Sequence, residues 1–158
     1  MKIIKLLTVF VMMGCSTMGA QILSPAEWQV KMSKDFVSQG DDLELVFIIK
    51  LDTNWHLYGN VQNYDLGPIP TSFMFEPDSG YILLGSIRAI GIQSEYDDVF
   101  EVQVNYFENQ AEFRQKIKIL SENPVIKGVC EYQVCSMVDG KCVFGMEDFE
   151  FKINIKNQ

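Results

Sequence analysis

The chain has 158 residues, of which 47% are hydrophobic, 22% charged and 12% aromatic. This composition is typical of a globular protein and excludes a disordered, collagen-like or low-complexity chain. Thirteen basic and 21 acidic residues give a net charge of −8, which disfavours nucleic acid and anionic lipid as partners. The chain contains four cysteines and one histidine, so thiol or imidazole chemistry is confined to a few positions.

The first 20 residues have the layout of a secretory signal peptide. Lys2 and Lys5 precede an apolar run at 6–13, and small residues follow it. The run is too short to span a bilayer, so we expect cleavage after Ala20 and export of residues 21–158. An alternative is lipid attachment at Cys15. No later apolar stretch approaches membrane-spanning length, and we expect no membrane span in the mature chain.

Beyond residue 20 the hydrophobic pattern has a period of two. Apolar and polar residues alternate in the stretches 43–51, 100–106, 113–119 and 149–155, as in strands with one buried face. Turn signals rich in Gly, Pro, Asn and Asp separate them. We count seven to nine short strands and no amphipathic helix. The pattern predicts one all-β domain, an immunoglobulin-like antiparallel β-sandwich.

Two stretches break the alternation, at residues 52–72 and 91–99. The first is rich in aromatic residues, Gly and Pro, and the second is acidic. We expect both to be irregular loops. Loops of this kind on a rigid sandwich often carry binding chemistry, although they can equally be connections that cover the ends of the sheets.

The cysteines near the C-terminus lie in a predicted hairpin. A strand at 126–135 leads through a turn and returns at Cys142. A two-residue turn would place Met137 opposite Cys142 and leave Cys135 diagonal to it, about 7–8 Å away, which is too far for a disulfide. A four-residue turn places Cys135 directly opposite Cys142, with Gly140 where a positive φ is needed. We predict the second register and a Cys135–Cys142 disulfide.

Cys130 precedes Cys135 by five residues, so in an unbroken strand it faces the other side of the sheet. We predict that it is a buried free thiol. A zinc site of Cys130, Cys135, Cys142 and His56 is disfavoured by their spacing and by that parity. We therefore expect no metal and no other cofactor, and we expect His56 to be packed at a strand end.

The hairpin disulfide can be structural or reactive. It closes a small loop, which limits its stabilising effect. A disulfide at the end of a hairpin is also accessible to an attacking thiolate. The residues alone favour neither interpretation.

Three segments resemble a known family. The run GVCEYQVCSMVDGKCVF resembles the cysteine hairpin of the N-terminal periplasmic domain of DsbD, the thiol:disulfide interchange protein. NWHLYGN with GPIPTSFMF, and EYDDVFEVQVNYFENQAEFRQKIKI, agree in order and position. The resemblance covers nearly all of residues 25–155 and is greatest to stand-alone, Bacteroidetes-like forms. It implies a periplasmic, monomeric immunoglobulin-like domain with a reversible disulfide, which a DsbD-like membrane reductase reduces and which passes electrons to thioredoxin-like proteins.

The resemblance also implies the site residues. Cys135 and Cys142 match the catalytic cysteines, and we favour Cys142 as the one that attacks a partner. A cap loop at residues 96–100 is expected to shield them, and its acidic pair is expected to raise the pKa of a nearby thiol. The cap loop and the aromatic residue beside it comprise Tyr58, Tyr96, Asp97, Asp98, Val99 and Phe100.

This sequence departs from the family pattern in four places. Val99 stands where the cap loop usually has an aromatic residue, Glu101 replaces a glycine that follows it, and residues 143–145 replace prolines. Cys130 stands where the family generally has another residue type. An alternative function is therefore a non-enzymatic protein-binding module on the same sandwich, with a purely structural disulfide.

Overall fold

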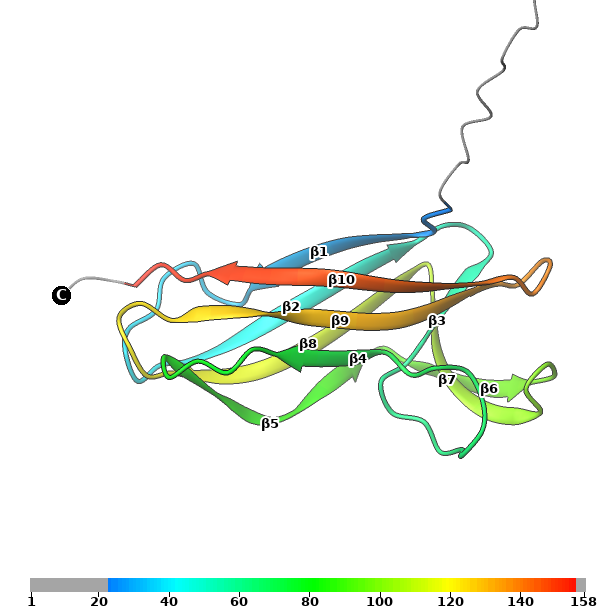
Figure 1. Ribbon diagram of the computed structural model, residues 1–158, viewed down its shortest axis with the longest axis horizontal. Coiled ribbons are helices and arrows are strands. Elements are labelled where there is room, and N and C mark those ends of the chain that lie inside the picture. The colour runs from blue at the N-terminus through cyan, green and yellow to red at the C-terminus, as the bar shows by residue number, and fades with distance from the viewer. Residues whose placement is uncertain (1–22, 156–158) are drawn as a thin grey trace, which may run out of the picture.

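The computed structural model describes residues 23–155, which form ten β-strands in two sheets and no helix (Figure 1). Every pairing between these strands is antiparallel. The predicted all-β, antiparallel sandwich is thus confirmed. The signal peptide at 1–20 and Cys15 lie outside the described residues. Within those residues, no helix is long and apolar enough to cross a membrane.

The first sheet has the strand order β1-β2-β8-β5. Its strands are β1 (Ala26–Met32), β2 (Asp42–Leu51), β8 (Gln110–Ile119) and β5 (Tyr81–Ile90). The second sheet has the order β10-β9-β3-β7-β6, and β4 also pairs with β9. Its strands are β10 (Cys142–Lys152), β9 (Val125–Ser136), β3 (Trp55–Tyr58), β7 (Val102–Glu108), β6 (Gln93–Asp97) and β4 (Ser72–Phe75).

The core lies between the two sheets, where the alternating apolar residues of each strand meet. In β2, Leu43, Leu45, Phe47 and Ile49 are fully buried, as the period-two pattern predicts. Aromatic rings from the second sheet surround Phe47 with centroids 4.7–6.3 Å away, namely Phe73, Phe75, Phe149 and Phe151. This packing makes the sandwich a rigid platform for its loops.

The prediction that residues 52–72 and 91–99 are irregular is wrong in part, because each contains a strand: β3 and β6. β6 is an exposed, polar edge strand that is held by backbone pairing to β7, so it gives no hydrophobic alternation. β3 is apolar on successive residues because both of its faces are covered. These two strands bring the count to ten, above the seven to nine expected. Phe100, predicted to begin a strand, lies in the turn before β7.

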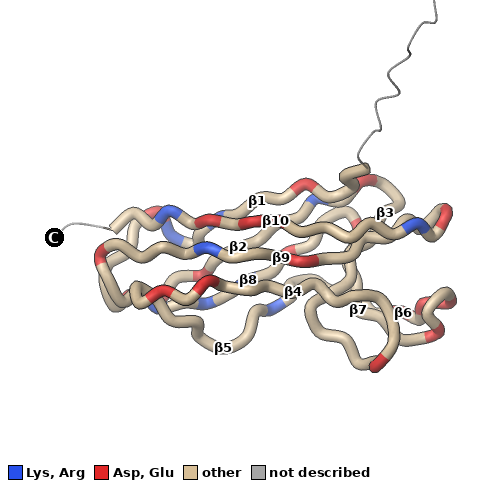
Figure 2. The backbone as a smooth tube through the Cα atoms, in the orientation of Figure 1, with Lys and Arg blue, Asp and Glu red and all other residues tan. Residues whose placement is uncertain are grey.

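Two hairpins project from the same end of the sandwich, β6–β7 and β9–β10 (Figure 1). Acidic residues gather at the tip of β6–β7 (Figure 2), whereas the β9–β10 turn carries the single acidic residue Asp139. Lys141 neutralises part of that charge, since its Nζ lies 2.7 Å from the Asp139 carboxylate. One edge of β9 pairs with two strands in succession. It pairs with β4 near the middle of the molecule and with β3 at the end that carries the hairpins.

Candidate functional site: a disulfide hairpin under a capped pocket

The β9–β10 hairpin places Cys135 directly opposite Cys142, and the two form a disulfide. The backbone N–H of Ser136 donates to the carbonyl of Lys141 at 2.8 Å, so the cysteines occupy the adjacent position without ladder hydrogen bonds. Opposed side chains are closest at such positions, and the two cysteine Cα atoms are 4.1 Å apart. The predicted register and disulfide are confirmed.

The turn that fixes this register is the four-residue loop 137–140. Gly140 has a φ of +67°, in the region that favours glycine, and its N–H donates to the Ser136 carbonyl at 3.0 Å. The Ser136 hydroxyl accepts the backbone N–H groups of Val138 and Asp139 at 3.2 and 3.3 Å. The turn therefore satisfies its own backbone groups and holds the cysteines in register.

The two cysteines of the disulfide differ in exposure. Cys135 is only 3% exposed and packs with Tyr58, Val104 and Tyr106 on the outer face of the second sheet. Cys142 lies on the edge strand β10 and is partly exposed. Cys142 is therefore the more accessible cysteine of the pair.

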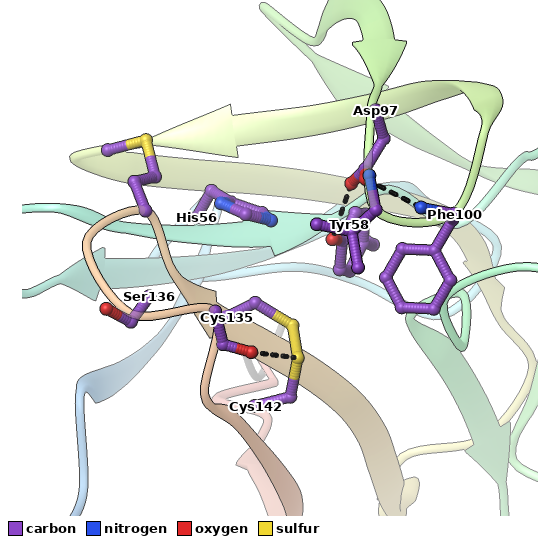
Figure 3. A pocket seen from close by; sticks show the side chains of 10 residues that line it. His56, Tyr58, Asp97, Phe100, Cys135, Ser136 and Cys142 are labelled. Carbon is purple, nitrogen blue, oxygen red and sulfur yellow. Dashed lines mark hydrogen bonds between the residues drawn. A yellow bond between two sulfur atoms is a disulfide. The ribbon is translucent and has the colours of Figure 1, made fainter.

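A pocket of about 220 Å³ opens beside the disulfide (Figure 3). Its wall combines the cysteine hairpin, strand β3 and the turn that follows β6. The lining residues are His56, Tyr58, Asp97, Val99, Phe100, Cys135, Ser136, Met137, Gly140 and Cys142. Segments more than 70 residues apart in the chain thus meet at the disulfide.

Asp97 holds the cap loop with three hydrogen bonds. One carboxylate oxygen accepts the backbone N–H groups of Val99 and Phe100 at 2.9 and 3.1 Å, an arrangement typical of a tight Asp turn. The other accepts the Tyr58 hydroxyl at 3.1 Å. Burial, and then the Asp97 carboxylate, raise the pKa of Tyr58 well above its ordinary value, so the hydroxyl keeps the proton that it donates.

Two departures from the family pattern lie in the turn after β6. Glu101 has a φ of +57°, a left-handed conformation that glycine adopts without steric cost, and this is the position where the family resemblance places a glycine. Val99 is 79% exposed, so its side chain covers little. Phe100 provides the aromatic contact instead, with its ring edge-on to Tyr58 at 6.3 Å.

The predicted site residues divide into two groups. Six of them line the pocket: Cys135, Cys142, Tyr58, Asp97, Val99 and Phe100. Tyr96 and Asp98 are exposed and are not among the lining residues. Of the acidic pair expected near the thiols, the structure therefore brings only Asp97 to the pocket.

His56 belongs to the site, although the sequence predicted only a packed residue. It pairs with Cys135 across β3 and β9, and its ring lies edge-on to Tyr58 at 4.8 Å (Figure 3). Burial lowers the pKa of His56 below its ordinary value, and the carboxylates of Asp97, Glu95 and Glu108 partly oppose this change. In the sequence, His56 only stands in an aromatic stretch beside Trp55. That position does not reveal that β9 and Cys135 lie opposite it.

Gln133 was missed by the sequence analysis. It lies two residues before Cys135, so both side chains are on the same face of β9. Its side-chain Nε2 lies 3.3 Å from the Cys135 Sγ. The only available signal was a polar residue at an alternating position between Tyr132 and Val134, which is also typical of a solvent-facing residue.

Cys130 lies on the opposite face of β9, in the main core, and is a buried free thiol. The prediction from parity is confirmed. Burial, followed by the Glu147 carboxylate, raises the pKa of the Cys130 thiol strongly, so it stays protonated and unreactive. Across residues 23–155 no group of His, Cys, Asp and Glu is arranged to hold a metal ion.

The sequence profile for the N-terminal domain of the thiol:disulfide interchange protein DsbD matches residues 20–153. The chain belongs to the DsbD N-terminal domain family. A sequence search among curated proteins finds no match.

Solved structures agree with this DsbD assignment at the level of the fold. The reduced DsbD N-terminal domain of Neisseria meningitidis matches with a TM-score of 0.53 and 16% identity, over 79% of this chain and 85% of that one. The N-terminal periplasmic domain of ScsB from Proteus mirabilis matches with a TM-score of 0.56 and 13% identity. That match covers 83% of this chain but 47% of the ScsB chain. The predicted immunoglobulin-like sandwich is confirmed.

The Asp97 hydrogen bonds predict how the disulfide is shielded. Replacing Asp97 with Ala removes both acceptor oxygens and with them all three hydrogen bonds, so the cap loop should open more often and the Cys135–Cys142 bond should react faster. At about 1 kcal/mol for each of the three hydrogen bonds, or about 3 kcal/mol in all, we expect reduction by dithiothreitol to accelerate about a hundredfold. The measurement is the rate of thiol appearance under a fixed excess of the reductant.

The matched control for this experiment is Asp98→Ala, which removes the same charge from the neighbouring exposed position. We expect its reduction rate to stay within about twofold of the parent chain, because an exposed charge is well screened. Equal acceleration in both variants would show that charge, rather than the hydrogen bonds of Asp97, controls access to the disulfide.

The lowered pKa of His56 predicts a pH dependence of stability. Above pH 6.5, its ordinary value, the residue is neutral in both states and its full contribution is present. As the pH falls below 6.5, the unfolded chain binds a proton more readily than the folded one, so the free energy of unfolding decreases. Urea unfolding of the oxidised chain between pH 5.5 and 8 should show this decrease. In a His56→Gln variant the decrease should be smaller, and parallel curves for the two proteins would contradict the assignment.

Proposed function

We propose that this domain is a periplasmic thiol–disulfide exchange module, which cycles between the Cys135–Cys142 disulfide and the dithiol. The observation that carries the proposal is the pairing of a buried and a partly exposed sulfur at a hairpin end, beneath a turn held by a few hydrogen bonds. Members of its family are periplasmic. The signal peptide that the sequence predicts at residues 1–20 supports the same location.

The exchange proceeds through the exposed sulfur. When a partner dithiol reduces the domain, its thiolate attacks Cys142 Sγ, the bond to Cys135 breaks, and Cys135 leaves as a thiolate. The second partner thiol then attacks the mixed disulfide and releases Cys142. Two electrons and two protons pass from the partner, which becomes a disulfide, to the two cysteines of this domain.

The reverse sequence reduces a partner disulfide, and Cys142 is the attacking thiolate. We propose a DsbD-like membrane reductase as the electron donor and thioredoxin-like proteins as acceptors, because the DsbD family assignment implies them. Phe144 and Met146 support docking beside the disulfide. Both are exposed, and their register opposite Gln133 and Glu131 places them on the same face as Cys142.

Single-cysteine variants test the assignment of roles. Cys135→Ser leaves Cys142 as the hairpin thiol, and Cys142→Ser leaves Cys135. We expect the Cys142 thiol to react with an aromatic disulfide reagent at least about tenfold faster, because Cys135 is buried and buried thiols react slowly. Peptide mass spectrometry of the adducts separates both from reaction at Cys130.

The decisive companion experiment uses a thioredoxin-like protein that lacks its resolving cysteine and carries an activated disulfide. The Cys135→Ser chain should form a stable mixed disulfide with it, and the Cys142→Ser chain should not. Two results together would favour the alternative of a binding module with a structural disulfide. The Cys135→Ser chain would form no mixed disulfide, and the Cys135→Ser, Cys142→Ser double variant would still bind the partner noncovalently with unchanged affinity.

A further inference from the structure

The Gln133 side chain connects the buried sulfur of the disulfide to the loop that covers it. Gln133 is only 4% exposed. Its Oε1 accepts the backbone N–H of Ile69 at 2.7 Å, and its Nε2 donates toward the Cys135 Sγ at 3.3 Å. The contact with the Cys135 sulfur is buried, so this hydrogen bond is stronger than one at the surface. The contact with Ile69 is only partly buried.

The orientation of this amide follows from chemistry. A backbone N–H is a donor and cannot face the amide NH₂ group, so the amide oxygen must face Ile69. The NH₂ group is then directed at the sulfur. The loop at 59–71 that presents Ile69 is itself anchored, because the Thr71 hydroxyl donates to the Tyr58 carbonyl at 2.5 Å and Tyr64 donates to the Pro68 carbonyl at 2.6 Å.

The strength of the contact depends on the redox state of the sulfur. A disulfide sulfur accepts hydrogen bonds only weakly, whereas a thiolate is a full negative charge and accepts them well. The amide therefore interacts more strongly with the Cys135 thiolate than with the intact disulfide. Such a differential interaction lowers the pKa of the thiol and makes it a better leaving group.

The remaining surroundings of Cys135 disfavour a thiolate. Burial does so directly, and the Asp97 carboxylate lines the same pocket. From β3, His56 and Tyr58 face the site, and both are neutral above pH 6.5 because burial lowers the pKa of the first and raises that of the second. On the hairpin, Lys141 is already paired with Asp139. Gln133 is thus the donor in direct contact with the sulfur.

We propose that Gln133 is a catalytic residue of the exchange reaction, donating a hydrogen bond to the Cys135 thiolate that leaves when a partner thiolate attacks Cys142. The inference rests on the proposed thiol–disulfide exchange. In that step the Cys135–Cys142 bond breaks, a bond forms between Cys142 and the partner sulfur, and the electron pair of the broken bond goes to Cys135. The Gln133 proton stays on its nitrogen.

The test uses a Cys142→Ser chain, in which Cys135 is a free thiol in contact with Gln133. Replacing Gln133 with Met keeps the length of the side chain but removes the donor. We expect the pKa of the Cys135 thiol, followed by NMR of isotope-labelled cysteine, to rise by about one unit. The Cys130 thiol gives a separate cysteine resonance, and burial raises its pKa strongly.

Gln115→Met in the same background is the matched control. Gln115 is also buried, but its amide donates to the carbonyls of Gly85 and Lys116 in the other sheet. It should lower stability without changing the pKa of Cys135. A Gln133→Met chain that folds and leaves this pKa unchanged would overturn the proposal.

A second measurement needs no change at Gln133. In the Cys142→Ser chain, the side-chain amide resonances of Gln133 should shift with pH in step with ionisation of Cys135, and no shift would overturn the proposal even if the Met variant fails to fold. These readouts are independent of turnover. If the parent disulfide proves inert while the resonances still shift, the exchange function fails and the hydrogen bond stands.

Discussion

The site depends on the burial of strand β9 on both of its faces at one end. Most of this strand buries one face in the core and leaves the other partly exposed, but from Tyr132 to Ser136 every residue is buried. The second face is covered by the loop at 59–71 and by the turn after β6. Within residues 132–136, Cys135 points away from the core between the two sheets. It is therefore shielded from solvent without being part of that core.

This double burial separates the properties of the two cysteines. They are opposite one another in the hairpin, yet one lies beneath the covering segments and the other on an edge strand. The sulfur that a partner can reach is bonded to a sulfur in a low-dielectric environment, where hydrogen bonds and charges act strongly. The Gln133 amide and the Asp97 carboxylate act there with opposite sign on a thiolate. In the proposed exchange, the balance between them, rather than the hairpin alone, sets the reactivity of the pair.

The features that follow from local rules could be predicted from the sequence. Alternation predicted the buried face of β2, and Gly140 with the cysteine spacing predicted the hairpin register and the disulfide. Parity along β9 predicted that Cys130 is apart from the pair. β6 could not be predicted, because an exposed edge strand is stabilised by backbone pairing and has no apolar pattern. The roles of Gln133 and His56 could not be predicted either, since each depends on a partner segment that is distant in sequence, such as Ile69 or Cys135.

The reduction potential of the Cys135–Cys142 disulfide distinguishes an exchangeable bond from a structural one. The folded domain would be equilibrated in glutathione buffers of graded composition, and the fraction of disulfide counted after thiol blocking. For an exchangeable disulfide we expect a potential of about −200 to −230 mV, among those of exchangeable couples. A potential below about −300 mV would mark a structural disulfide and would contradict the proposed exchange.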